Sequence, residues 1–302
     1  MQDILKNRIR EAISGKISFN EPLFRHTTFR IGGPIDFWVE PKDIDDLRQS
    51  LEFCKREGIN LYIIGKGSNI LVRDEGLRGM AVHLSQPFFK KIYIKGEFVR
   101  ARGGVLLWDL INHCAQRGLS GLEFLAGIPG TVGGALAMNA GGAKDDNGIG
   151  DFVERVIVID REGRQRIMRR GDINFSYRSS NLADYVIVEG AFRLKKSDKK
   201  IVTAGCRNFL KTKKISQVLD KPSCGSVFKN PDGVKFSAWE LVDKAGLRGL
   251  KMGGAQVSDK HANFIVNEKA ATFNDVSNLM NLIQREVLEK YNVKLEPEIK
   301  IL

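Results

Sequence analysis

The sequence lacks the features of a secreted, membrane-spanning or metal-binding protein. Its four cysteines, Cys54, Cys114, Cys206 and Cys224, are isolated and form no CxxC pair. Isolated cysteines indicate free thiols in a reducing cytoplasm rather than a disulfide framework. The four histidines are also scattered, so we expect no metal site. No apolar run approaches the about 20 residues that span a bilayer, and residues 1–12 lack a signal-peptide core. We therefore expect a cytoplasmic protein without membrane insertion.

The charge is strongly unbalanced toward the basic side. Lysine and arginine number 48 against 36 acidic residues, giving a formal net charge of +12. Such an excess indicates an anionic partner, either nucleic acid or a nucleotide cofactor with a nucleotide-linked substrate. The basic residues are scattered over 90–102, 161–170 and 195–214, with no recognition helix, zinc finger or aromatic strand signature. Nucleic acid is therefore the weaker interpretation, although a nucleotide- or nucleic-acid-binding protein without redox activity remains the alternative class.

The length of 302 residues predicts two or three domains, and hydrophobic periodicity predicts a mixture of helices and strands, with a separate α+β unit in the last third of the chain. Asp43 is placed to cap a helix that Gly58 ends. A lysine-rich run at 195–200 is expected to be a solvated turn at a domain boundary. Helices are expected over 3–14, 44–57, 105–117, 203–213, 237–244 and 274–290, and strands over 35–40, 61–64, 70–72, 80–84, 91–95, 98–102, 153–160, 164–168, 185–194, 261–266 and 293–302.

Residues 126–142 form an unusual stretch, AGIPGTVGGALAMNAGG, in which glycine and alanine predominate. Glycine inside a helix costs about 1 kcal/mol against alanine, so such a run needs a physical reason. Bare backbone can approach a ligand closely and point successive N–H groups at an anion. Pro129 fits a first helical turn, and a short helix from Thr131 onward would direct its N-terminus at a phosphate. The alternative is tight packing of backbone on backbone.

A second glycine signal, Gly65-Lys66-Gly67-Ser68-Asn69, follows a short buried strand. It supplies flexible backbone, a hydroxyl and an amide, which suit a phosphate or a ribose. The spacing is not that of a P-loop, and no helix follows as in the GxGxxG dinucleotide fingerprint. By itself the turn is equally compatible with a plain hairpin.

Seven motifs in the same order and spacing resemble the UDP-N-acetylenolpyruvoylglucosamine reductase family, in its shorter (type II) class. They are His26–Gly33, Gly65–Asn69, Ala126–Gly141, Tyr177-Arg178, Pro222–Pro231, Gly249–Asn267 and Leu295-Glu296-Pro297-Glu298. The resemblance covers nearly the whole chain. It implies an FAD-binding portion of the vanillyl-alcohol-oxidase (PCMH) type made of two α+β subdomains, 1–86 and 87–202, followed by a substrate-binding domain, 203–298. Strand 299–302 either closes that domain or returns to the first subdomain.

The same resemblance implies the activity and its partners. The family reduces the enolpyruvyl group of UDP-N-acetylglucosamine enolpyruvate to UDP-N-acetylmuramate, a precursor of bacterial peptidoglycan. NADPH as co-substrate reduces the FAD; hydride then passes from flavin N5 to C3 of the enolpyruvyl group, and C2 receives a proton. We expect the UDP-sugar and NADPH as small-molecule partners, no nucleic acid, and a monomer.

Site residues are carried over at matching positions. Ser226 resembles the proton donor to C2, and Arg178 with Glu298 resembles the pair that engages the substrate carboxylate and the enolic charge. Without the resemblance each of the three would be read as a turn, surface or strand residue. Expected to hold the flavin are Gly65, Lys66, Gly67, Ser68, Asn69, Gly127, Ile128, Pro129, Gly130, Thr131, Gly133, Gly134, Ala137, Asn139 and Gly141.

Substrate-binding roles are implied for a smaller set, which comprises Tyr177, Lys214, Asn230, Lys251 and Gln256. His261 is implied as a pocket residue; for Lys214 and His261 a merely solvated position is an equal alternative.

Two features depart from the family pattern. The region between Asp160 and Ala204 is short and lacks the inserted segment that supplies a tyrosine over the substrate in the longer class. Cys224 stands where a small residue, often alanine, is expected; it is either an inert small hydrophobe or an oxidisable thiol. A second enzymatic alternative is an oxidase or dehydrogenase on the same flavin scaffold, which would reoxidise rapidly with oxygen.

Overall fold

The protein is described by a computed structural model, which covers residues 2–142 and 147–302 and divides into two compact units. The first comprises the chain up to Glu21 together with Ile35–Gly65 and Arg78–Leu210, and the second comprises Pro22–Pro34, Lys66–Leu77 and Lys211–Leu302. Two short segments of the N-terminal half, 22–34 and 66–77, therefore belong to the same unit as the last third of the chain. The chain crosses from one unit to the other inside the Gly65–Asn69 turn.

A four-stranded sheet of order β1-β2-β5-β3 begins the first unit. Its strands are β1 (Lys16–Pro22), β2 (Pro34–Glu40), β3 (Leu61–Ile63) and β5 (Leu77–Val82), and its helices are α1 (Gln2–Ala12) and α2 (Ile44–Glu57). The carboxylate of Asp43 accepts a hydrogen bond from the Asp46 N–H at 3.0 Å, and Gly58 ends α2 with φ +63°. Both predicted ends of this helix are confirmed.

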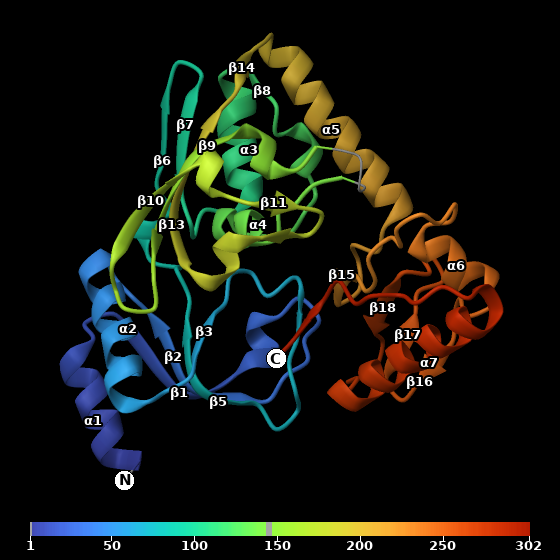
Figure 1. Cartoon of the computed structure of the whole chain (residues 1–302), viewed down its shortest axis with the longest axis horizontal. Coiled ribbons are helices and arrows are strands. Elements are labelled where there is room, and N and C mark those ends of the chain that lie inside the picture. The colour runs from blue at the N-terminus through green and yellow to red at the C-terminus, as the bar shows by residue number, and fades with distance from the viewer. Residues whose placement is uncertain (1, 143–146) are drawn as a thin grey trace. The chain divides into compact units, whose positions relative to one another are not determined.

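The second sheet of this unit has five antiparallel strands in the order β10-β9-β13-β7-β6. They are β6 (Ile92–Lys95), β7 (Phe98–Arg102), β9 (Val153–Ile159), β10 (Gln165–Arg169) and β13 (Val186–Arg193). Helices α3 (Leu107–Gln116) and α4 (Val132–Ala137) cover one of its faces (Figure 1). Val99, Val156 and Phe192 of the sheet share a buried core with Leu110 of α3 and Leu136 of α4. The opposite face carries the alternate side chains of the same strands.

Smaller elements complete the first unit. Strand β8 (Leu119–Ser120) pairs with β14 (Lys195–Lys196), β11 (Phe175–Ser176) pairs with β12 (Ser179–Ser180), and α5 (Lys199–Ser216) leads toward the second unit. The predicted solvated turn at 195–200 is therefore wrong in part: its first two lysines form a strand pair and its last two begin α5. A strand two residues long leaves too little alternation for a periodicity to be recognised.

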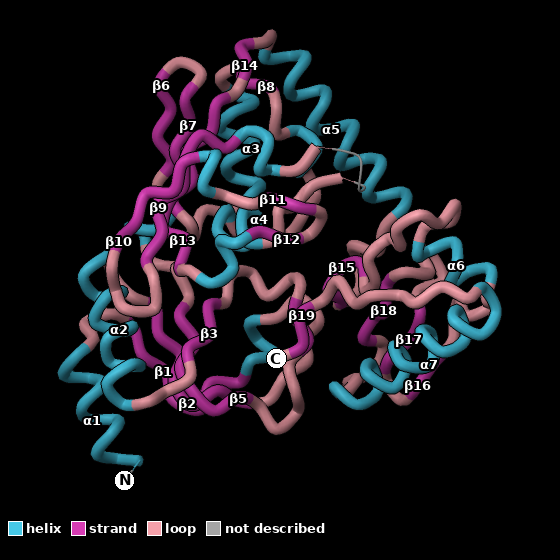
Figure 2. The backbone as a smooth tube through the Cα atoms, in the orientation of Figure 1, coloured by secondary structure: helices cyan, strands magenta, loops and turns pink. Residues whose placement is uncertain are grey.

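The second unit contains a four-stranded sheet, order β15-β18-β17-β16, with helices α6 (Ala238–Lys244) and α7 (Phe273–Tyr291) (Figure 2). The strands are β15 (Ser223–Ser226), β16 (Lys251–Met252), β17 (Ala255–Val257) and β18 (Phe264–Asn267). Its core includes Val276 and Ile283 of α7 together with Phe29, Ile31 and Leu71 from the two N-terminal segments. Strand β19 (Lys300–Ile301) runs parallel to β4 (Ile70–Leu71) in this unit.

Three predicted boundaries need correction. A strand, β1, occupies residues where no helix or strand was expected, and the strand expected over 293–302 is reduced to Lys300–Ile301. Helix α5 is longer than the predicted 203–213. Strand limits depend on pairing partners distant in sequence, so local periodicity alone does not set them.

No helix in the described part of the chain is long and apolar enough to cross a membrane.

Candidate active site

The glycine-rich stretch folds as an extended lead-in followed by the six-residue helix α4. Thr131 caps this helix, its hydroxyl accepting a hydrogen bond from the Gly134 N–H at 3.2 Å. A short helix from Thr131 is thus confirmed, whereas Pro129 lies before the helix rather than in its first turn. Residues 127–130 are not buried, so this backbone is open to a ligand.

Gly65, the first residue of the second glycine segment, packs against Thr131 of the glycine-rich stretch in the first unit. A Cβ added at Gly65 would lie 2.7 Å from the hydroxyl of Thr131, so the absence of a side chain permits their contact. The strands on either side of the Gly65–Asn69 turn pair with different partners, β3 with β5 and β4 with β19. This excludes the plain hairpin that the sequence left open.

Packing explains some of these glycines and leaves others unexplained. At Gly67, which has φ +66°, a Cβ would lie 2.0 Å from the carbonyl oxygen of His26, and at Gly133 it would lie 3.1 Å from that of Gly103. At Gly130 and Gly134 the nearest atoms are ordinary contacts at 3.5 and 3.4 Å. Neither of these two has a positive φ, so the protein itself does not require glycine there. Bare backbone at such positions fits a bound dinucleotide.

Arg178 sits at the tip of the β11–β12 hairpin. Its backbone has φ +56°, uncommon for a residue with a side chain, and its guanidinium lies 4.8 Å from the ring centre of Tyr177. The amide of Asn139 donates to the Ser176 carbonyl at 3.0 Å, and the Ser180 hydroxyl donates to the carbonyls of Leu136 and Ala137. Both sides of the tip are thereby fixed to the end of the glycine-rich stretch.

In the second unit, Val227 follows Ser226 in the chain and is hydrogen-bonded to the backbone of Glu298. The Val227 N–H donates to the Asn263 carbonyl at 2.9 Å, and the Val227 carbonyl accepts from the Glu298 N–H at 2.8 Å. The register of β15 shifts between Ser223 and Ser226, where Gly225 has φ +80°. Such a bulge turns the side chain that follows it out of the regular alternation. Ser226 and Glu298 are both partly exposed.

Asn263 fixes this arrangement and was not found from the sequence. Its side-chain oxygen accepts from the Phe228 N–H at 3.0 Å, and its side-chain NH₂ donates to the Phe228 carbonyl at 2.8 Å. A buried amide that bonds both groups of one residue locks that residue's backbone. The only sequence signal was its position inside the 249–267 motif.

Asn69 of the Gly65–Asn69 segment, which was predicted to bind flavin, also contacts the backbone around Glu298 in this unit. Asn69 donates from its amide to the Glu298 carbonyl at 3.2 Å, and the Asn69 carbonyl accepts from the Lys300 N–H at 2.9 Å. Thr28 binds the carbonyl of Ser223 through its hydroxyl at 2.7 Å. The backbone around Ser226 and Glu298 is therefore braced by residues from both N-terminal segments.

Cys224 is fully buried two residues before Ser226. Burial raises the pKa of its thiol to about 12, and the nearby charge of Glu298 acts in the same direction. A thiol with this pKa is neutral and poorly nucleophilic at neutral pH. Of the two alternatives for Cys224, the structure fits an inert small hydrophobe.

The predicted substrate residues lie in different settings. Asn230 accepts from the Ala238 N–H at the start of α6, and Gln256 donates to the Gly249 carbonyl and to Asp259. Lys214 on α5 and Lys251 on β16 are exposed. Tyr177, on the hairpin tip, belongs to the first unit with Arg178, whereas the other four belong to the second unit with Ser226 and Glu298.

His261 packs against aromatic rings. Its ring centre lies 4.8 Å from that of Phe264 and 6.0 Å from that of Trp239, while its Nδ1 accepts from the Asn263 N–H at 3.3 Å. Burial, and secondarily the charge of Arg248, lowers the pKa of His261 from 6.5 to about 4. The imidazole is therefore neutral at physiological pH and is not merely solvated.

Two family models match the chain. One, described as the C-terminal domain of UDP-N-acetylenolpyruvoylglucosamine reductase, covers residues 217–302, and an FAD binding domain covers residues 35–169. The first supports the last third of the chain as a substrate domain, and the second supports FAD as the cofactor.

Full-length relatives carry the same description. The UDP-N-acetylenolpyruvoylglucosamine reductase of Carboxydothermus hydrogenoformans is 42% identical over 99% of this chain and 98% of its own length. That of Bacillus pumilus is 38% identical over 99% and 98%. Among solved structures, the UDP-N-acetylenolpyruvylglucosamine reductase of Thermus caldophilus matches with a TM-score of 0.81 and 32% identity, covering 96% of this chain and 99% of that one.

Fold, motifs and full-length similarity agree, including the PCMH-type flavin-binding portion and the C-terminal substrate domain. The chain therefore belongs to the UDP-N-acetylenolpyruvoylglucosamine reductase family of FAD-dependent oxidoreductases.

Proposed function

We propose that the protein reduces the enolpyruvyl group of UDP-N-acetylglucosamine enolpyruvate with electrons from NADPH, and that Ser226 donates the proton to C2. FAD held by the glycine-rich segments would supply the hydride chemistry between NADPH and the enolpyruvyl group. The observation that carries this proposal is the backbone of Val227, which ties Ser226 and Glu298 to the same short stretch. The chain's own residues donate the proton and hold the substrate and the cofactor.

Ser226 is suited to donate a proton only under specific conditions. A hydroxyl is a weak acid in water, but a strongly basic enolic carbon in a site without water can take its proton. The donor must also be held in one position, because catalysis depends on alignment within fractions of an ångström. The bulge at Gly225 and the two hydrogen bonds of Val227 supply that rigidity.

Arg178 and Glu298 act on the substrate carboxylate and the enolic oxygen. A guanidinium binds both oxygens of a carboxylate at once, and its charge stabilises negative charge that develops during the reaction. The ring of Tyr177 beside the Arg178 guanidinium restricts its orientation. Glu298 contributes by sharing a proton with the substrate.

The residues around α4 hold the cofactor in this proposal. Gly130 and Gly134, which packing does not require to be glycine, admit the flavin dinucleotide, and Gly65–Asn69 binds its phosphates. We divide the chain into two flavin subdomains, residues 1–86 and 87–202, and a substrate domain, residues 203–298. The buried free cysteines fit a reducing cytoplasm as the location of the reaction.

Separate measurement of the two half-reactions tests the role of Ser226. In Ser226→Ala, NADPH under anaerobic conditions should bleach the flavin at the unaltered rate, because no proton donation by Ser226 occurs in that step. Reoxidation by the enolpyruvyl sugar nucleotide should slow by about 10²- to 10⁴-fold. Stopped-flow absorbance of the flavin measures both rates.

Ser223→Ala is the matched control, since Ser223 lies on the same strand and its carbonyl, which accepts from the Thr28 hydroxyl, is kept in the variant. It should leave both half-reactions within about twofold of the parent. Equal slowing of both half-reactions in Ser226→Ala would contradict the assignment. Rapid reoxidation of the reduced parent protein by oxygen alone would instead favour an oxidase.

A further inference from the structure

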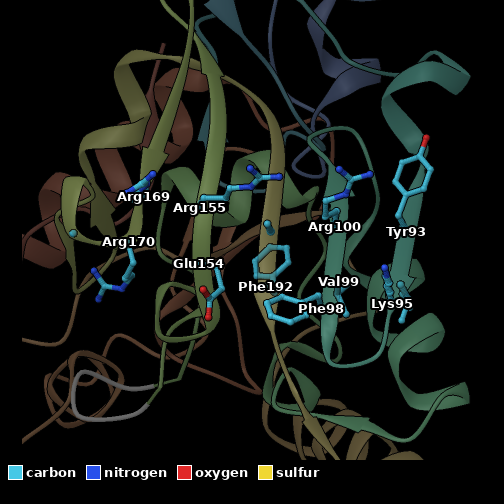
Figure 3. A pocket seen from close by; sticks show the side chains of 13 residues that line it. Tyr93, Lys95, Phe98, Val99, Arg100, Glu154, Arg155, Arg169, Arg170 and Phe192 are labelled. Carbon is cyan, nitrogen blue, oxygen red and sulfur yellow. The ribbon is translucent and has the colours of Figure 1, made fainter.

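The face of the five-stranded sheet opposite α3 and α4 carries a row of arginines in one line across the strands. The strand register places Arg169 opposite Arg155, Arg155 opposite Ala191, Ala191 opposite Arg100, and Arg100 opposite Tyr93. Residues opposite one another in neighbouring strands share a face. With strands about 4.8 Å apart, the row extends for about 19 Å. Figure 3 shows the labelled members standing on this face of the five strands.

A hollow of about 760 Å³ lies along this row. Ala191 stands at its centre between the two longer side chains of Arg155 and Arg100, so the small residue creates the depression. Five cations and one carboxylate contribute to its lining: Lys95, Arg100, Arg155, Arg169, Arg170 and Glu154. The carboxylate is already engaged, because Glu154 binds Arg193 at 2.6 Å.

Two of the arginines have no counter-charge within the described residues. Neither Arg155 nor Arg169 has a described carboxylate within ion-pair distance of its side chain, although the two stand directly opposite each other. Like charges facing each other across strands destabilise a sheet. Asp172 accepts from the backbone N–H of Arg169 at 2.9 Å, but neither guanidinium forms an ion pair with a described carboxylate, so both are available to a ligand.

Arg100 is held ready for an anion. Its guanidinium lies 5.0 Å from the ring centre of Tyr93 and 3.8 Å from the buried carboxylate of Glu189. Glu189 is shared with Arg102 at 3.2 Å, so one positive charge of the pair stays uncompensated. A guanidinium fixed by an aromatic ring and a carboxylate loses little entropy when it binds a second carboxylate.

We propose that this sheet face, which we call the arginine face (Tyr93, Arg100, Arg155, Arg169 and Ala191), binds an acidic segment of a partner protein that carries an apolar side chain between its acidic residues. A row of about 19 Å exceeds a single small anion and equals about six residues of extended chain. The acidic groups pair with the arginines, and the apolar side chain enters the hollow over Ala191.

Single-stranded nucleic acid fits the arginine face less well. Binding of that kind needs aromatic rings open for base stacking. The two exposed aromatic residues of the hollow are both covered by arginine, Tyr93 by Arg100 and Phe98 by Arg193 at 4.4 Å. A base would therefore have to compete with an arginine for each ring, whereas carboxylates need no ring.

The test uses the FAD-loaded protein and fluorescein-labelled poly(Glu,Tyr) as the acidic and apolar probe, followed by fluorescence anisotropy. Arg155→Glu should weaken binding by about tenfold or more, because it removes one positive charge and adds a repelling one. The same change places a carboxylate opposite Arg169, so the melting temperature should stay level or rise. A purely structural role for Arg155 would lower stability instead.

Arg207→Glu is the matched control, because Arg207 is an exposed arginine on α5 away from the arginine face. It should change probe affinity by less than about twofold, apart from the general effect of net charge. Ala191→Leu keeps every charge but fills the hollow, and it should weaken poly(Glu,Tyr) while leaving poly-Glu nearly unaffected. Flavin absorbance of each variant reports whether the cofactor region is intact.

Three outcomes would overturn the proposal. One is equal loss of affinity in Arg155→Glu and Arg207→Glu, which would indicate non-specific attraction to a basic protein. Another is binding of oligo(dT) as tightly as poly(Glu,Tyr) with the same dependence on Arg155, which would assign the face to nucleic acid. The third is equal affinity of the parent protein for poly-Glu and poly(Glu,Tyr), which would remove the role of the hollow.

Discussion

Single residues in this protein act mainly by fixing the backbone around the residues proposed to react. Asn263 holds both polar groups of Phe228, and Val227 is bonded on one side to Asn263 and on the other to Glu298. None of these bonds involves a reacting group, yet they set where Ser226 and Glu298 stand. The sequence motifs named the residues proposed to react, but the bracing amide was found only from its contacts.

His261 gives a residue-scale prediction about pH. Its folded pKa of about 4 lies below the ordinary 6.5, so the unfolded chain binds more protons between these values. Stability contributed by the neutral imidazole is full above pH 6.5 and is lost as the pH falls toward 4, up to about 3 kcal/mol in all. Denaturant unfolding between pH 4 and 7 measures it.

His261→Gln supplies the comparison, because glutamine retains an acceptor for the Asn263 N–H without titrating. The variant should show a flatter dependence of unfolding free energy on pH over this range. An unchanged slope would mean that carboxylates, not His261, govern acid stability here.

At the scale of elements, α4 and its lead-in show why the glycines are of two kinds. Gly133 packs tightly on the Gly103 carbonyl, whereas Gly134 meets only the Thr131 hydroxyl at an ordinary distance. Sequence reasoning predicted the stretch as one ligand cradle and could not separate these roles. Local pattern carries no information about which side of a helix faces another backbone.

Gly134→Val should therefore leave a folded protein with little flavin. Valine and glycine differ modestly in helix propensity, so the fold should lose less than about 1 kcal/mol. Extra volume at the dinucleotide should lower flavin affinity by about tenfold or more. The ratio of flavin to protein absorbance and the melting temperature of the flavin-free form are measured together.

The matched variant is Gly205→Val on α5, where a Cβ would meet only the side chain of Glu123 at 3.5 Å. It should keep its flavin. A fully yellow Gly134→Val protein would show that the dinucleotide lies elsewhere. Gly133→Val should unfold more readily than Gly134→Val or Gly205→Val, because its Cβ meets the Gly103 backbone.

At the scale of the whole molecule, the second unit is assembled from three separate parts of the chain. Its core takes Phe29, Ile31 and Leu71 from segments that precede the first unit's five-stranded sheet, and β19 pairs with β4. A substrate domain over 203–298 was predicted from the sequence as a continuous α+β unit. In the structure those residues share their core with the N-terminal half.

A fragment of residues 203–302 should therefore not unfold cooperatively by itself, since it lacks three buried core side chains and the partner of β19. In the full chain, Phe29→Ala should cost about 3–5 kcal/mol, and the exposed neighbour Phe24→Ala less than about 0.5 kcal/mol. Circular dichroism during thermal unfolding measures all three. A sharp transition in the fragment would contradict this prediction.

The sequence by itself determined the parts that depend on local chemistry. The Asp43 cap and Gly58 stop of α2, the strands β6 and β7, and the family motifs with Ser226, Arg178 and Glu298 were all legible along the chain. Caps, turns and motif spacing act over a few residues, so their signals lie next to one another.

Only the tertiary structure decided what depends on register and on distant segments. The row from Arg169 to Tyr93 exists because five strands align their residues across the sheet, and a shift of one residue would send every side chain to the other face. The same holds for Asn263 beside Phe228 and for Phe29 in the second core. Their partners lie tens to hundreds of residues away, a distance that no local pattern encodes.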